Sequence, residues 1–102
     1  MPEPERFDKP IRDFLTFARV EAGLATATIE AYRRDLGDLC EDLGARGLTA
    51  PREVSADDLA DHMRWLARER MMQATSVARH LATIRVFFRW MNAEGLIERD
   101  PA

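Results

Sequence analysis

Hydroxyl and arginine side chains recur in the segment 74–91, and their spacing is the clearest chemical signal in the sequence. On a helix of about 100° per residue, Thr75, Arg79 and Thr83 fall on one face with Ser76 beside them. Arg85 and Arg89 fall on the flank nearer the expected core. Short hydroxyls and arginines near a helix N-terminus suit a phosphate backbone or base edges, because the helix end offers free N–H groups and partial positive charge. The pattern indicates contact with nucleic acid; the alternative is an ordinary solvated helix face.

No arrangement of residues for catalysis stands out. The sequence has no glycine-rich phosphate loop and no paired-histidine motif, and His62 and His80 are interpreted as surface or packing side chains on different helices. Cys40, the only cysteine, falls in an apolar stripe and reads as a small core residue. Asp57 and Asp58 resemble a carboxylate pair, but capping of a helix at Ser55 accounts for both. We therefore expect no metal, no cofactor and no small-molecule ligand.

Charge is distributed unevenly along the 102 residues, which carry a formal net charge of −3. Residues 1–62 hold eight basic and fourteen acidic groups, whereas residues 63–102 hold seven basic and four acidic groups. Fourteen of the fifteen basic residues are arginine, which forms forked contacts to phosphate and guanine, although GC-rich coding would also favour it. The single cysteine and the lack of any apolar run of about 18 residues predict a cytoplasmic protein without a membrane partner.

Apolar residues recur at three- and four-residue spacing in four segments, and each segment predicts an amphipathic helix. The expected helices span about 10–22, 26–43, 55–70 and 74–93, with no convincing strand, which predicts an all-α, compact four-helix orthogonal bundle. This pattern puts Thr83 opposite the core, and puts Val86 and Trp90 outside the core stripe. The expected core residues are Ile11, Phe14, Leu15, Ala18, Ala22, Ile29, Tyr32, Leu36, Leu39, Cys40, Leu43, Leu59, Met63, Leu66, Ala67, Val77, Leu81, Ile84, Phe88 and Met91.

Three segments together resemble the N-terminal core-binding domain of Xer-type tyrosine recombinases, which are phage-integrase-like proteins. They are GLATATIEAYRRDL (23–36), ATSVARHLATIRVFFRWM (74–91) and EGLIERDPA (94–102). The resemblance implies a SAM-like four-helix domain over residues 10–97. Residues 1–9 would then be an N-terminal tail, and residues 98–102 the start of a linker to a catalytic domain absent from the chain.

The resemblance implies that the second and fourth helices approach the major groove of a duplex half-site. Tyr32, the only tyrosine, matches a tyrosine of the binding domain and not the family's nucleophile, so the fragment is expected to be catalytically inert. The first helix would contact other recombinase protomers on DNA, through Phe17 and Val20 if these are exposed. Carried over by position, the implied DNA-binding residues are Thr26, Thr28, Tyr32, Arg33, Thr75, Ser76, Arg79, His80 and Thr83.

Two departures from the family pattern fall in one turn: Met71 stands where many relatives have glycine, and Gln73 where serine is common. The expected function is DNA binding within a site-specific recombinase, of the Xer type that resolves chromosome dimers. The same domain in a phage or transposon integrase is one alternative. A helical protein-interaction module without DNA binding, with Val86 and Trp90 as its patch, is the other.

Overall fold

The computed structural model describes residues 6–102, and within that range it contains four α-helices, one short 3₁₀ turn and no strand. The expected all-α fold is therefore confirmed. The expected tail over residues 1–9 lies partly outside the described residues, and Asp8 already begins the first helix. The elements are α1 (Asp8–Val20), α2 (Thr26–Ala45), η1 (Pro51–Glu53), α3 (Ala56–Arg68) and α4 (Ala74–Ala93).

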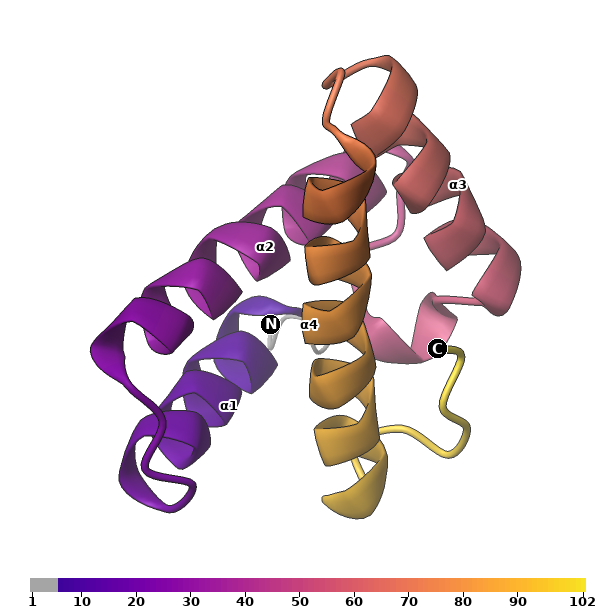
Figure 1. Ribbon diagram of the computed structural model, residues 1–102. Helices are drawn as coiled ribbons and strands as arrows, with labels where there is room; N and C mark the ends of the chain where they lie inside the picture. Colours follow the sequence, from indigo (N-terminus) through magenta and orange to yellow (C-terminus); the bar gives the residue numbers. More distant parts are fainter. Residues whose placement is uncertain (1–5) are drawn as a thin grey trace.

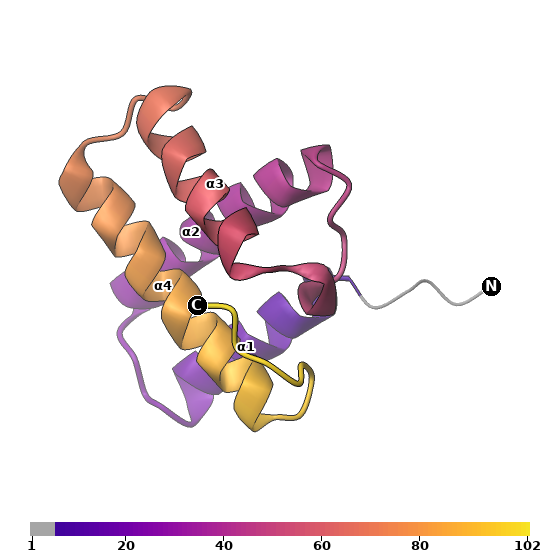
Figure 2. The same cartoon turned by 90° about the vertical axis from the view of Figure 1, so that its right-hand side faces the viewer.

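Helix α4 lies at the centre of the arrangement and packs against all three other helices (Figure 1). Figure 1 shows α1 and α2 next to each other on one side of α4 and α3 on the other, and Figure 2 shows α3 and α4 in front of α1 and α2. After α4 the chain turns back, so that residues 95–101 lie beside η1 and Ile97 is buried. None of the helices in residues 6–102 has the length and apolar character needed to cross a membrane.

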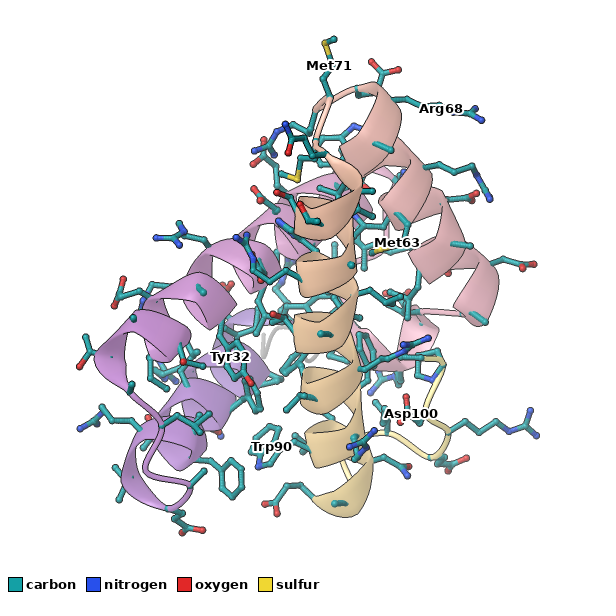
Figure 3. The ribbon with its side chains drawn as sticks, in the orientation of Figure 1. Tyr32, Met63, Arg68, Met71, Trp90 and Asp100 are labelled. Carbon is teal, nitrogen blue, oxygen red and sulfur yellow. The ribbon has the colours of Figure 1, made fainter. Side chains whose placement is uncertain are left out.

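Local chemistry explains where the helices begin and end. At the start of α3 the Ser55 hydroxyl accepts from the Asp58 amide at 3.1 Å, and the Asp58 carboxylate accepts from the Ser55 amide at 2.8 Å, which is a reciprocal capping box. Between α3 and α4 the chain turns at Met71, whose φ of 53° lies in the left-handed region that favours glycine. The Met71 side chain is 82% exposed and projects from this turn in Figure 3, so packing does not compensate for the strained backbone.

Aromatic side chains form the centre of the core where α1, α2 and α4 meet. The Phe14 ring stacks on Tyr32 with centroids 5.6 Å apart and meets Phe87 edge-on at 5.4 Å. Trp90 also packs on Phe14, at 5.6 Å, and on Phe17, at 6.1 Å. The prediction that Trp90 lies outside the core is therefore wrong, and Phe17 is half-buried against Trp90 instead of free. Contacts between aromatic rings stabilise the fold by more than the burial of their apolar surface alone.

The predicted orientation of α4 is wrong: the helix is rotated about its axis by roughly 50°, which is half of the rotation per residue. Thr83, expected opposite the core, is 2% exposed, and Phe87 is fully buried, while the predicted core residues Val77 and Leu81 are only half-buried. The reason is that α4 packs against three helices, so its buried face is wider than an apolar stripe and includes polar residues with partners inside. Two further expected core residues, Ala22 and Ala67, are exposed.

Candidate nucleic-acid interface

A buried carboxylate on α2 gathers three of the predicted site residues of α4. Asp35 is fully buried and accepts hydrogen bonds from Arg79 Nη2 to Oδ1 at 2.7 Å and from Arg79 Nε to Oδ2 at 3.3 Å. The Thr83 hydroxyl donates to Oδ2 at 2.7 Å, and His80 Nε2 lies 3.3 Å from Oδ1. The stretch from Arg79 to Thr83 is therefore tied to α2 by a charge-assisted network and does not form a freely solvated face.

Arg79 is the member of this network that reaches the surface. Its side chain is 49% exposed, although two of its nitrogens are held by the carboxylate. The hydrogen bond from Asp35 raises the pKa of Arg79 above its usual value, so the guanidinium is charged at every pH of interest. Arg79 thus presents a fixed positive charge beside the α2–α4 junction.

His80 and Thr83 lie inside the fold and not on its surface. His80 is 1% exposed and its Nδ1 has no hydrogen-bond partner among the described residues. Burial lowers the pKa of His80, and the opposing attraction of Asp35 does not restore it, so the ring is neutral at neutral pH. In this conformation neither side chain is open to a ligand, and both act on the surface through Asp35.

The predicted residues of α2 separate onto two sides of that helix. Tyr32 and Thr28 are half-buried, and Tyr32 lies between α2 and α4 (Figure 3). Thr26 and Arg33 instead line a groove between α1 and α2, and the Arg33 guanidinium lies 3.6 Å from Glu30 in an exposed ion pair. The structure therefore brings Tyr32 toward α4 but leaves Thr26 and Arg33 on the opposite flank.

The first turns of α2 and α4 are open at their N-terminal ends. Neither Ala25 nor Gln73, the residues that precede these helices, provides a side-chain cap, and neither first turn contains an acidic residue. Thr75 is exposed and Ser76 half-exposed at the start of α4. Uncapped N–H groups and the helix dipole favour an anion at such ends. The capped start of α3, with its own carboxylates, lacks this property.

Three arginines that the site prediction omitted are the free cations of this region. Arg34 of α2 and Arg85 and Arg89 of α4 are exposed, and none has an ion-pair partner within residues 6–102. Asp35, the residue after Arg34, turns inward to Arg79 and does not pair with Arg34. Helical spacing drew attention to Arg85 and Arg89 but put them on the flank nearer the core. The two lie four residues apart on the side of α4 opposite its buried face.

Other cations are committed to structural pairs. Asp42, two turns after Asp35 on α2, accepts from Arg46 at 3.1 and 3.0 Å and lies 2.7 Å from His62 Nδ1 on α3. Arg70 lies over the Trp65 ring at 5.4 Å. The Asp42 contacts tie α2 to α3, and Arg46 and Arg70 are occupied by contacts within the protein.

Cys40 is chemically quiet. Burial, with a smaller contribution from Asp8, raises the pKa of its thiol to about 12, so it stays protonated. Among residues 6–102 no group of three metal-ligating side chains gathers into a metal site.

Comparison with known proteins assigns the chain to a class that fits this surface. Residues 11–95 match the family described as phage integrase, N-terminal SAM-like domain, and the chain belongs to that family. The resemblance inferred from the three sequence segments is confirmed.

The similar curated proteins are Xer-type tyrosine recombinases. "Tyrosine recombinase XerD" of Listeria monocytogenes serotype 4b is 40% identical over 92 residues, which cover 89% of this chain and 31% of that protein. "Tyrosine recombinase XerC" of Roseiflexus sp. is 37% identical over 91 residues, covering 89% of this chain and 29% of that protein. "Tyrosine recombinase XerD" of Rhizobium meliloti is 38% identical over 91 residues, with the same two coverages. No solved structure is matched significantly.

The chain spans less than a third of the length of these relatives. The matched family is an N-terminal domain, so the chain corresponds to the N-terminal domain of a tyrosine recombinase. That domain is not the catalytic one in this class.

Proposed function

We propose that this chain binds double-stranded DNA through α2 and α4 and holds a recombination half-site for a tyrosine recombinase. The observation that carries the proposal is the set of cations at these two helices: Arg34, Arg85 and Arg89 are exposed without internal partners, and Arg79 is half-exposed. Arginines on adjacent helices neutralise phosphates along a duplex and position the protein on it.

The remaining contacts of this surface are polar. Thr28 on α2 and Thr75 and Ser76 on α4 supply hydroxyl donors close to uncapped helix ends, which suit phosphate oxygens. Tyr32 supplies another hydroxyl in the second turn of α2. Thr26 and Arg33 lie in the α1–α2 groove and would reach DNA only at the edge of the interface. His80 and Thr83 support Asp35 and do not contact the duplex directly.

The chain's net charge of −3 limits the affinity of such a small surface. A few phosphate contacts give micromolar or weaker binding at low salt, with a log–log salt slope of roughly 0.9 per phosphate neutralised. In the whole recombinase, other protomers and the catalytic domain would add the remaining affinity. Strand cleavage belongs to that catalytic domain, and the domain described here holds the DNA half-site in place.

In the cell we propose a cytoplasmic Xer-type recombinase that resolves chromosome dimers. Similarity to proteins named XerC and XerD favours this role over a phage or transposon integrase with the same domain. The alternative function is a helical protein-interaction module that does not bind DNA, and the experiment below distinguishes the two.

The experiment is fluorescence anisotropy with a labelled synthetic duplex over a salt series. The double variant Arg85→Ala/Arg89→Ala should lower the salt slope by about two, because each phosphate contact contributes roughly 0.9. Arg68→Ala is the matched control, since Arg68 is exposed on α3 without an ion-pair partner in residues 6–102 and points away from α4 in Figure 3. Absence of binding at low salt, or equal losses in both variants, would contradict the proposal.

A further inference from the structure

We propose that Asp35 is a positioning residue for DNA recognition: it holds Arg79 in one orientation, so that one edge of the guanidinium faces the duplex. This inference rests on the proposed function, because it requires that α2 and α4 bind DNA. Asp35 is fully buried, so its carboxylate touches no ligand and acts only through Arg79.

The geometry leaves part of the guanidinium unused. Nε and Nη2 of Arg79 donate to the two oxygens of Asp35, and Nη2 also lies 3.3 Å from His80 Nε2. Nη1 has no partner within residues 6–102, and the side chain is half-exposed. Its free N–H donors can therefore reach a phosphate oxygen or the acceptor edge of guanine, the groups for which arginine is suited.

The carboxylate is itself fixed from inside the protein. Thr83 donates to Oδ2 at 2.7 Å, the same oxygen that accepts from Arg79 Nε, and its hydroxyl also lies 3.2 Å from the Arg79 carbonyl oxygen. A long arginine side chain normally loses rotamer freedom when it binds a ligand. Since this clamp orders Arg79 before DNA arrives, that cost is removed from binding.

A second cluster, around Asp42, has a similar arrangement but only a structural role. Asp42 holds Arg46 and His62 much as Asp35 holds Arg79 and His80. Arg46 passes a further donor to the carbonyl oxygen of Asp61 at 3.3 Å, so the protein itself uses that donor. Arg79 differs because its outer edge is left free on the DNA-binding side. Asp42 is therefore a matched control for Asp35.

The test is a double-mutant cycle on the complete 102-residue chain, with anisotropy of a labelled synthetic duplex as readout. The variants are Asp35→Asn, Arg79→Ala and the two combined, with Asp42→Asn as the control. Removing a carboxylate makes the protein less negative, which slightly favours DNA in both backgrounds and cancels in the cycle. If Asp35 positions Arg79, Asp35→Asn weakens binding roughly two- to twelvefold when Arg79 is present, the cost of ordering one long side chain. It should not weaken binding in the Arg79→Ala background, and Asp42→Asn should not weaken it at all.

Three results would overturn the inference. The first is tighter DNA binding by Asp35→Asn, which would mean that Asp35 sequesters Arg79 from DNA. The others are an equal effect of Asp35→Asn with and without Arg79, and a loss of affinity in Asp42→Asn equal to that in Asp35→Asn. A wild-type chain that does not bind the duplex would instead refute the proposed function, so the two failures are distinguishable. Circular dichroism reports whether Asp35→Asn folds. If it does not, Thr83→Val replaces it in the same cycle, because that variant loses one hydrogen bond to the carboxylate and keeps the charge.

Discussion

Acid should destabilise this fold through two buried histidines. His62 and His80 are almost completely buried, on α3 and α4, and each has one ring nitrogen without a partner among the described residues. Burial lowers the pKa of both rings below the ordinary 6.5, and the carboxylates Asp42 and Asp35 offset this only in part. Because the folded pKa values lie below the unfolded ones, the unfolded chain binds more protons, and stability falls as the pH drops below about 6.5.

The expected size of this effect follows from proton linkage. One pH unit below the unfolded pKa, a histidine that stays fully neutral in the fold costs about 1.4 kcal/mol. The two together therefore cost at most about 3 kcal/mol at pH 5.5. That is a large part of the roughly 5–15 kcal/mol by which a domain of this kind is stable. The loss should level off at lower pH, once the folded histidines also take up protons.

The assay is urea denaturation followed by circular dichroism at pH 7.5 and 5.5. The free energy of unfolding should be lower at pH 5.5, and His62→Gln or His80→Gln should each remove about half of the difference. Equal stability at both pH values, or greater stability at pH 5.5, would show that attraction to Asp42 and Asp35 outweighs burial.

Three further predictions concern single positions. Thr83→Ala should lower the free energy of unfolding by about 1–3 kcal/mol in chemical denaturation, because it removes a hydrogen bond to a buried carboxylate. Leu81→Ala, at a half-buried site, should cost no more, and a clearly larger loss there would contradict the observed orientation of α4. Met71→Gly should raise the melting temperature by relieving the left-handed backbone, a gain of up to about 1 kcal/mol, and a lower melting temperature would show that the turn is unstrained. The chain should form no covalent adduct with nicked DNA on a denaturing gel, since the family that it matches is the N-terminal and not the catalytic domain; an adduct that disappears in Tyr32→Phe would refute this.

The helices could be predicted because their signals are local. Apolar spacing identified all four, and the hydroxyl of Ser55 followed by Asp58 identified the start of α3. The rotation of α4 could not be predicted in this way, because hydropathy treats Thr83 and His80 as surface residues. Their burial depends on Asp35, which lies 48 residues before Thr83 in the chain and becomes a neighbour only after folding.

The candidate site could likewise be predicted only where its signal is local. Helical spacing alone separates Thr28 and Tyr32, four residues apart, from Thr26 and Arg33, seven residues apart, and the structure puts only the second pair in the α1–α2 groove. The pairing of Arg79 with Asp35 is a contact between distant segments and has no local signal.

Amide chemical-shift mapping during titration with a short synthetic duplex tests whether DNA lies across α2 and α4. If it does, salt-sensitive shifts concentrate at Thr28, Tyr32, Thr75 and Arg85 and spare the outer side of α3. Shifts centred instead on the exposed end of α1 around Val20, or no shifts at low salt, would contradict it.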